Sequence, residues 1–410
     1  MRKATFFALI ALACLQSVTY ADQVKLGDPA LTAGIPGQGD LTVPQVTAWL
    51  AKPENHQPLE VQLPEGLAPG KDSIYIPADN QITRAKIELG RQLYFDRRLS
   101  AGNEVSCADC HHPDNGYGRN TQFGVGIKGL TGDRNSPTSM NRILSKAQFW
   151  DGRAKDLEAQ AVGPIANPIE MGNTHEVVVK FVSANPVYKA QFEKIFGRAA
   201  NIDDVGRALA TFERVIVTGN SPYDYQARVD KLDAYMQSEG IKSLDELKQE
   251  EPKIYADYVA AKKVATENPM SDSAKRGQKL FFSNEVNCSA CHVGVNFTDE
   301  KYHNLGVGMA AKTPDLGRYK ETKVDADKGA FKTPSLRNVA QNGPYMHDGS
   351  QRTLLEVVEW YSKGGHPNPQ LSDKIKAFKV TDQEKKDLVV FMEALSGPLP
   401  KVEMKRLPAN

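Results

Sequence analysis

The chain has 410 residues, and at roughly 150 residues per domain this length predicts two or three domains. Hydrophobic residues make up 40% of the chain and charged residues 25%, which is typical of a folded globular protein. The 51 Lys and Arg residues nearly balance the 50 Asp and Glu residues, giving a net charge of +1. This balance argues against nucleic acid or an anionic membrane surface as the main partner.

The N-terminus has the layout of a secretory signal peptide. Met1-Arg2-Lys3 is positively charged, residues 4–15 are almost wholly apolar, and Ala21 offers a small residue for cleavage. The apolar run is shorter than the roughly 18 residues that a membrane anchor needs. We therefore expect residues 1–21 to be a signal peptide that directs the protein to the periplasm, with no membrane span. Lipidation at Cys14 is the alternative, although the residues ahead of it fit that signal poorly.

Four of the five cysteines form two copies of one motif, Cys107-Ala-Asp-Cys110-His111 and Cys288-Ser-Ala-Cys291-His292. In this pattern the cysteines attach a haem through two thioethers, and the adjacent histidine binds the iron. A zinc site would need the two distant pairs to converge, and a thioredoxin-like dithiol would need a βαβ context that the sequence lacks. We therefore predict two covalently bound haem c groups with His111 and His292 as proximal iron ligands.

The sequence around the two motifs repeats. An amphipathic stretch at 89–95 recurs at 275–282, and each copy is followed by Asn-Glu-Val ahead of the first cysteine. Such a repeat predicts two related domains, and the lack of β alternation makes the fold class mainly α. The expected organisation is an irregular N-terminal extension at 22–75, a first haem domain at 76–265 with a charged helical insertion near 227–267, and a second haem domain at 266–400.

Further sequence blocks carry a family resemblance. They are Arg134-Asn-Ser-Pro-Thr138, Gln148-Phe-Trp-Asp-Gly-Arg153, Phe331-Lys-Thr-Pro-Ser-Leu-Arg-Asn338 and Pro344-Tyr-Met-His-Asp-Gly349. Together with the paired haem motifs, they resemble the bacterial dihaem cytochrome c peroxidases and their MauG-type relatives. The resemblance implies two cytochrome c-like domains, with peroxide reacting at haem 1 and electrons passing through haem 2.

The resemblance also implies three residues that carry chemistry. Trp150 corresponds to the tryptophan between the two haems, where an indole is a polarisable bridge that can itself be oxidised. Gln160 and Glu170 correspond to the distal pocket of haem 1. Burial raises the pKa of a carboxyl group towards neutrality, so that Glu170 is suited to proton transfer while Gln160 positions peroxide or water. The alternatives are a core aromatic residue and a capping or surface carboxylate.

Two departures from the typical peroxidase follow from the same comparison. The family's sixth ligand of haem 2 falls at Tyr361, which is methionine in typical peroxidases and tyrosine in MauG-type enzymes. An oxygen ligand favours the more oxidised states of the iron. The rival ligands are Met309, Met346 and His347, and an ordinary helix-end aromatic residue is the structural alternative. The loop between Pro113 and Asp133 contains no histidine, whereas typical peroxidases use one there to cap haem 1. We therefore expect an open sixth position on haem 1, with His175 as the first alternative cap.

The family further implies one calcium ion between the domains, with Asn135, Asn342 and Pro344 as ligands. Asn342 replaces the usual threonine, and its amide oxygen also suits a hard cation.

These observations predict a periplasmic dihaem peroxidase that takes electrons from a cytochrome c or a small copper protein. A MauG-type enzyme that uses hydrogen peroxide to oxidise side chains of a partner protein is the second hypothesis. A dihaem electron-transfer cytochrome without catalysis is the third. Gln160 and Glu170 argue against the third, because a simple electron carrier needs no polar pocket beside an open haem.

Overall fold

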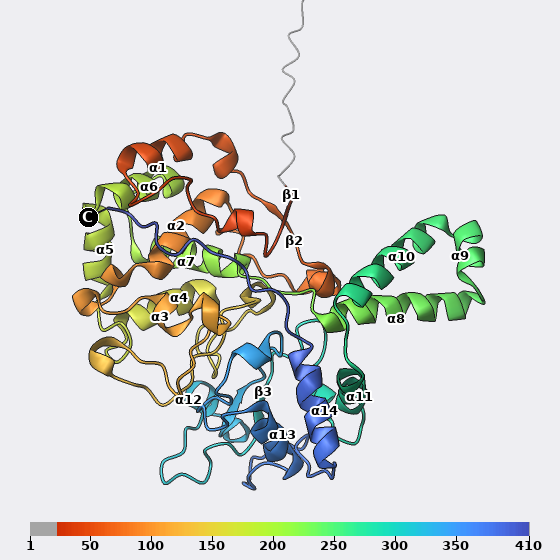
Figure 1. The fold of residues 1–410 in the computed structure, drawn as a ribbon. Helices are drawn as coiled ribbons and strands as arrows, with labels where there is room; N and C mark the ends of the chain where they lie inside the picture. Colours follow the sequence, from red (N-terminus) through yellow and green to blue (C-terminus); the bar gives the residue numbers. More distant parts are fainter. Residues whose placement is uncertain (1–22, 410) are drawn as a thin grey trace, which may run out of the picture.

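The computed structural model describes residues 23–409, so the expected signal peptide and Cys14 lie outside the described residues. Helices dominate the molecule, and the strands form only short pairs among these residues (Figure 1). The mainly α fold class is therefore confirmed. No helix within the described range is long and apolar enough to cross a membrane.

The N-terminal extension wraps over the first domain. Strand β1 (Gln23–Lys25) pairs in parallel with β2 (Glu60–Gln62). Helix α1 (Val43–Leu50) buries Val46 and Leu50 in a small core that it shares with α6 (Pro186–Phe196). The rest of the extension consists of turns and short 3-10 segments, so the segment is largely irregular but not without helix.

The first domain is built on the contact between two helices, α2 (Arg84–Phe95) and α7 (Ile202–Val215). Gly90 of α2 permits the close approach, because a Cβ atom there would collide with the carbonyl group of Ala208. Aromatic residues including Tyr94 and Phe212 pack edge to face beside this crossing, with ring centroids 5.0 Å apart. Around this pair lie α3 (Cys107–Cys110), α4 (Leu157–Ala166), α5 (His175–Ala184) and α6.

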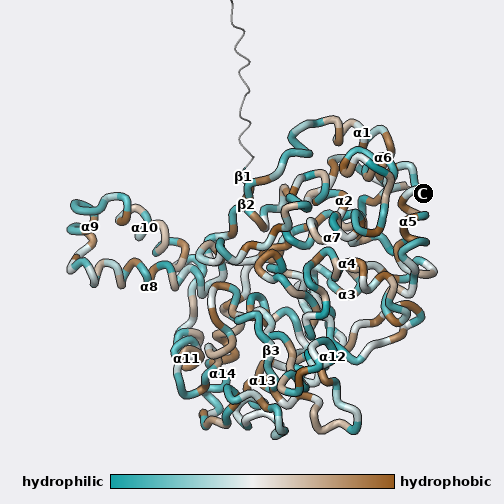
Figure 2. Tube along the Cα trace, turned by 180° about the vertical axis from the view of Figure 1, so that it is seen from behind, coloured by the Kyte–Doolittle hydropathy of each residue, from teal (hydrophilic) through white to brown (hydrophobic). Residues whose placement is uncertain are grey.

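A helical arm projects from the body of the molecule (Figure 1). It consists of α8 (Pro222–Glu239), α9 (Leu244–Glu250) and α10 (Pro252–Glu267), and hydrophilic residues cover much of its length (Figure 2). The arm begins five residues before the expected insertion, because Ser221 and Asp224 form a capping box that starts α8.

The second domain repeats the central crossing of the first. Helix α11 (Asp272–Phe281) packs against α14 (Asp382–Glu393), and a Cβ atom at Gly277 would collide with the carbonyl group of Asp387. Gly90 and Gly277 occupy matching positions in the repeated sequence stretch. The remaining elements of this domain are β3 (Tyr302–Asn304), α12 (Tyr319–Thr322), β4 (Ala330–Lys332) and α13 (Leu354–Ser362), with β3 antiparallel to β4.

The C-terminal segment returns to the first domain. The buried Arg91 of α2 donates hydrogen bonds to the carbonyl oxygens of Glu403 (2.6 Å) and Arg406 (2.9 Å). Asn185 donates to the carbonyl oxygen of Ala409 (2.7 Å). Residues 403–409 thus pack against the first domain.

Candidate functional site

The first haem motif begins in the short helix α3. Ser106 caps this helix, and its backbone N–H donates to the carboxylate of Asp109 at 2.8 Å. The single helical turn places Cys107 and Cys110 on the wall of a cavity of about 450 Å³ that His111 also lines. Cavities of this size commonly hold cofactors.

The groups in this first cavity fit a haem. Burial raises the pKa of Cys107 and Cys110, whereas a redox-active dithiol needs a lowered pKa. Burial also lowers the pKa of His111, which keeps the imidazole in the neutral form that binds metals. The Nδ1 atom of His111 is buried without a hydrogen-bond partner among the described residues.

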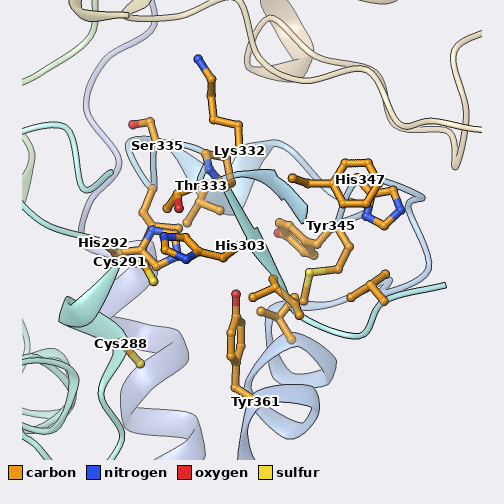
Figure 3. A pocket seen from close by; sticks show the side chains of 18 of the residues that line it. Cys288, Cys291, His292, His303, Lys332, Thr333, Ser335, Tyr345, His347 and Tyr361 are labelled. Atoms are coloured by element: carbon orange, nitrogen blue, oxygen red, sulfur yellow. The ribbon is translucent and has the colours of Figure 1, made fainter. Parts of the chain in front are cut away.

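The second haem motif lies in a separate cavity of the second domain (Figure 3). Cys288, Cys291 and His292 line it, and burial raises the pKa of the two thiols to about 12 and about 11. His292 Nδ1 contacts the carbonyl oxygen of Phe297 at 2.9 Å, a bond that fixes the imidazole and leaves Nε2 for a metal. Because the two cysteine pairs line different cavities, one zinc ion shared by all four is excluded.

Tyr361 comes from α13 and lies within this second cavity. Its hydroxyl group points into the space that His292 borders, and burial raises the pKa of the phenol (Figure 3). Of the rival ligands, Met346 and His347 also line the cavity, and His347 stacks on Phe331 with ring centroids 3.5 Å apart. Met309 is not among the lining residues of the described chain.

Trp150 lies in the wall that the two cavities share. Its indole N–H donates to the carbonyl oxygen of Asn135 at 2.9 Å, and its own carbonyl oxygen accepts from the N–H of Lys332 in β4 at 2.8 Å. The residue before it, Phe149, has a left-handed backbone (φ 67°), which is strained for an aromatic residue. The guanidinium group of Arg153 lies 3.5 Å from the centre of the Phe149 ring and covers it.

Gln160 and Glu170 both line the first cavity. Gln160 is on α4, and its side-chain oxygen is buried without a hydrogen-bond partner among the described residues. Glu170 lies in the turns after α4, where burial raises its pKa and the positive charge of Arg153 partly opposes that effect. The structure therefore brings together a carboxyl group and an amide that the sequence separates by ten residues.

The loop without histidine closes one side of the first cavity. Gly124, Gly126 and Gly132 line the cavity, and a Cβ atom at Gly126 would collide with the backbone of Ile169 and Glu170. Among residues 23–409, His111 is the only histidine that lines this cavity. His175 begins α5 and its Nε2 contacts the carbonyl oxygen of Val162 at 2.9 Å instead.

Asn135, Asn342 and Pro344, the expected calcium ligands, line one wall of the second cavity. The Oδ1 atom of Asn342 is buried without a hydrogen-bond partner in the described part of the chain, while its amide nitrogen donates to the carbonyl oxygen of Asn338 at 3.0 Å. The side-chain amide nitrogen of Asn135 donates hydrogen bonds to the carbonyl oxygens of Thr121 and Gln122. The side-chain oxygens of Asn135 and Asn342 therefore accept no hydrogen bond among the described residues, which fits a hard cation.

Several charged residues that the sequence did not single out also line the cavities. Arg142 and Lys332 border both cavities, and Lys332 is held by Glu300 at 2.8 Å. Glu213 of α7 lines the first cavity, and His303, paired with Asp299 at 2.8 Å, lines the second. Arg142 and Lys332 fall within or next to the recognised blocks, but no spacing rule marks Glu213 or His303.

Two haem-binding motifs in two related helical domains, each facing its own cavity, define a dihaem c-type cytochrome. A family model described as "Di-haem cytochrome c peroxidase" matches residues 84–231, and a cytochrome c model matches residues 274–396. The chain belongs to the di-haem cytochrome c peroxidase and MauG family, as the sequence blocks predicted.

Individual relatives agree with this assignment. Methylamine utilization protein MauG of Methylorubrum extorquens is 35% identical over 339 residues, covering 82% of this chain and 85% of its own. Cytochrome c551 peroxidase of Nitrosomonas europaea is 34% identical, covering 79% and 83%. Among solved structures, a MauG-like protein associated with microbial copper homeostasis aligns with a TM-score of 0.65 and 27% identity, covering 79% of this chain and 93% of its own. The protein is thus an oxidoreductase of the class that acts on peroxide, and the family carries two haem c groups.

Proposed function

We propose that the protein is exported to the periplasm and reduces hydrogen peroxide to water at haem 1. Electrons would reach haem 1 through haem 2 from a cytochrome c or a small copper protein. The observation that carries the proposal is that Gln160 and Glu170 both line the first cavity. Trp150 lies in the wall between this cavity and the second one. A polar pair at an open haem serves peroxide chemistry and has no use in a simple electron carrier.

Each cavity residue has a distinct part in this reaction. Haem bound at Cys107, Cys110 and His111 would supply the redox chemistry that splits the O–O bond. Glu170 would accept the proton from the inner oxygen of peroxide and return it to the leaving oxygen, which departs as water. The carboxamide of Gln160 would hold the peroxide in the orientation that this transfer needs. Trp150 would connect the two cavities electronically, and the hydroxyl oxygen of Tyr361 would bind the iron of haem 2.

A MauG-type reaction is the second candidate, and Tyr361 is the observation that favours it. The relatives named MauG show that the family includes proteins assigned to methylamine utilization. In this version, a side chain of a partner protein would replace the small redox protein as the source of electrons.

Steady-state peroxide consumption distinguishes these candidates. Catalytic turnover with a reduced cytochrome c or cupredoxin supports the peroxidase. Slow consumption with those donors, together with new covalent oxidation products in periplasmic extract, supports the MauG-type reaction. Absence of peroxide consumption under both conditions would show a non-catalytic electron-transfer cytochrome.

We also infer a calcium ion at Asn135, Asn342 and Pro344. Metal analysis of the purified protein tests this site. We expect about one calcium per chain in the wild type and less in Asn342→Leu, and equal calcium in both proteins would rule the site out.

A further inference from the structure

Glu213 is a buried carboxyl group that the proposed reaction does not use. It lies on α7, it is 7% exposed, and its side chain lines the first cavity together with Cys107 and His111. Neither oxygen of its carboxyl group has a hydrogen-bond partner among the described residues. Burial without a partner disfavours the ionised form of a carboxyl group, so a protein retains one where its charge is useful or absent.

The cations near Glu213 are directed to other partners. Arg214 donates to both carboxylate oxygens of Glu158, at 2.6 and 2.8 Å. Arg142 donates to Gln148 and Ser145. The two cations therefore favour ionisation of Glu213 only from a distance.

The other elements packed around Glu213 provide no counter-charge. Tyr94 of α2 donates its hydroxyl proton to the carbonyl oxygen of His111, and Cys107 of α3 is the haem-bearing thiol. The negative charge of Glu158 on α4 opposes ionisation. Burial, as the largest cause, raises the pKa of Glu213 to about 7, against the pull of Arg142 and Arg214. The carboxyl group thus titrates near neutral pH beside the haem attachment site.

We propose that Glu213 exchanges a proton with solvent as haem 1 changes oxidation state. If haem 1 loses one electron to an external one-electron acceptor, such as an electrode or a redox mediator, the cavity gains one positive charge. Glu213 then releases its proton and becomes a carboxylate, which restores the charge of the cavity. On reduction by one electron the carboxyl group takes a proton back, so electrons and protons balance in both directions. Glu213 is a positioning residue: it acts through the charge that it carries beside haem 1 and does not contact peroxide.

This role predicts how the midpoint potential of haem 1 depends on pH. A carboxylate stabilises the ferric form, so the potential falls as the pH rises through the range in which Glu213 titrates. The limit is one proton per electron, a tenfold change in proton concentration for about 59 mV. Redox titrations of the two-haem protein measure this slope between roughly pH 5.5 and 8.5. The range extends about one and a half pH units to either side of pH 7.

The test compares Glu213→Gln with two controls. Glu213→Gln keeps the shape of the side chain, and we expect it to flatten the pH dependence of haem 1 and leave that of haem 2 unchanged. Glu193→Gln, a surface variant on α6, should keep the full slope. Glu170→Gln measures the contribution of the second glutamate in the cavity whose pKa burial raises.

An unchanged slope in Glu213→Gln would overturn the proposal, because the haem propionates or Glu170 would then account for it. Covalent haem content and the absorbance of both haems are measured on the same samples. A loss of haem would reveal a folding defect, in which case Glu213→Leu, which suits an apolar environment, replaces the first variant. Because the readout is a potential and not turnover, failure of the proposed peroxidase reaction leaves this test intact.

Discussion

The environment of Glu170 suits a group that takes and returns a proton. Burial raises its pKa, and the positive charge of Arg153 limits that rise by favouring the ionised carboxylate. We expect Glu170→Gln to retain both haems and to lower the rate of peroxide cleavage by about 10²–10⁴-fold, because an amide cannot carry the proton. Stopped-flow mixing with peroxide measures this rate. A wild-type rate in the variant would remove Glu170 from the reaction.

The pH dependence of the wild-type protein provides a second measurement of the same group. A general base must be ionised, so cleavage slows as the pH falls through the pKa of Glu170. Since that pKa is raised, the acidic limb of the rate profile should lie above the range of an ordinary carboxyl group, which titrates near 4.3. Glu170→Gln should lack this limb, which distinguishes it from titration of peroxide or of the haem propionates.

Trp150 is tested by a change that keeps an aromatic ring. Trp150→Phe removes the indole hydrogen bond to Asn135, at a cost of about 0.5–1.5 kcal/mol in the free energy of unfolding. We expect both haems to be retained, and the exchange of oxidising equivalents between them to slow. Rapid-scan absorbance after peroxide addition follows both haems separately. Equal exchange rates in variant and wild type would assign Trp150 a packing role.

The crossing of α11 and α14 predicts that Gly277 does not tolerate a side chain. Gly277→Ala places a Cβ atom against the carbonyl group of Asp387 and 2.9 Å from Cβ of Phe391. We expect it to lower the free energy of unfolding of the second domain by about 1–3 kcal/mol, the usual cost of overpacking. Urea denaturation followed by haem absorbance measures the loss.

The matched control is Gly163→Ala in α4. The added Cβ atom lies 3.6 Å from the nearest atom of Phe149, an ordinary contact. Alanine is favoured over glycine within a helix, but Pro164 follows and disfavours a Cβ atom at this position, so this variant should be close to neutral. Similar losses in both variants would mean that the close helix approach does not determine the effect.

The repeated sequence predicted these elements because local pattern and packing agree there. Leu89 and Leu93 mark the buried face of α2, Ala274 and Phe281 mark that of α11, and a glycine lies on both faces. The arm starts five residues before the expected position, at the capping box that Ser221 forms with Asp224. The return of residues 401–409 to the first domain has no local signal, because Arg91 binds backbone carbonyl groups more than three hundred positions away.

Only part of the arrangement of the two cavities can be predicted from the sequence. Motif spacing predicted the haem residues, and the resemblance named Trp150, Gln160, Glu170 and Tyr361, all of which line a cavity. Glu213 was not predictable, because it shares α7 with other charged residues and only the packing of that helix shows which of them face the cavity. The buried side-chain oxygens of Gln160 and Asn342, which have no hydrogen-bond partner among the described residues, can be identified only once the domains are folded.

The state of the resting molecule depends on both cavities together. Within residues 23–409, the first cavity has no histidine besides His111, and His175 is bound to the carbonyl oxygen of Val162. A haem bound there would therefore have no cap of the kind that a loop histidine provides. The second cavity contains the buried hydroxyl group of Tyr361, and an oxygen ligand makes a haem hard to reduce. A molecule with this combination gains nothing by waiting for reduction of haem 2.

We accordingly expect the fully oxidised protein to contain one high-spin haem and one low-spin haem with histidine and tyrosine ligands. It should react with peroxide without prior reduction and accumulate an oxidised state that both haems share. Electron paramagnetic resonance of the resting protein measures the two spin states. Tyr361→Phe should convert the low-spin signal of haem 2 into a high-spin signal, while the high-spin signal of haem 1 persists. Two low-spin signals in the wild type, with peroxide reactivity only after one-electron reduction, would show that another side chain caps haem 1. Repeating the measurement on His175→Ala would then decide whether that side chain is His175.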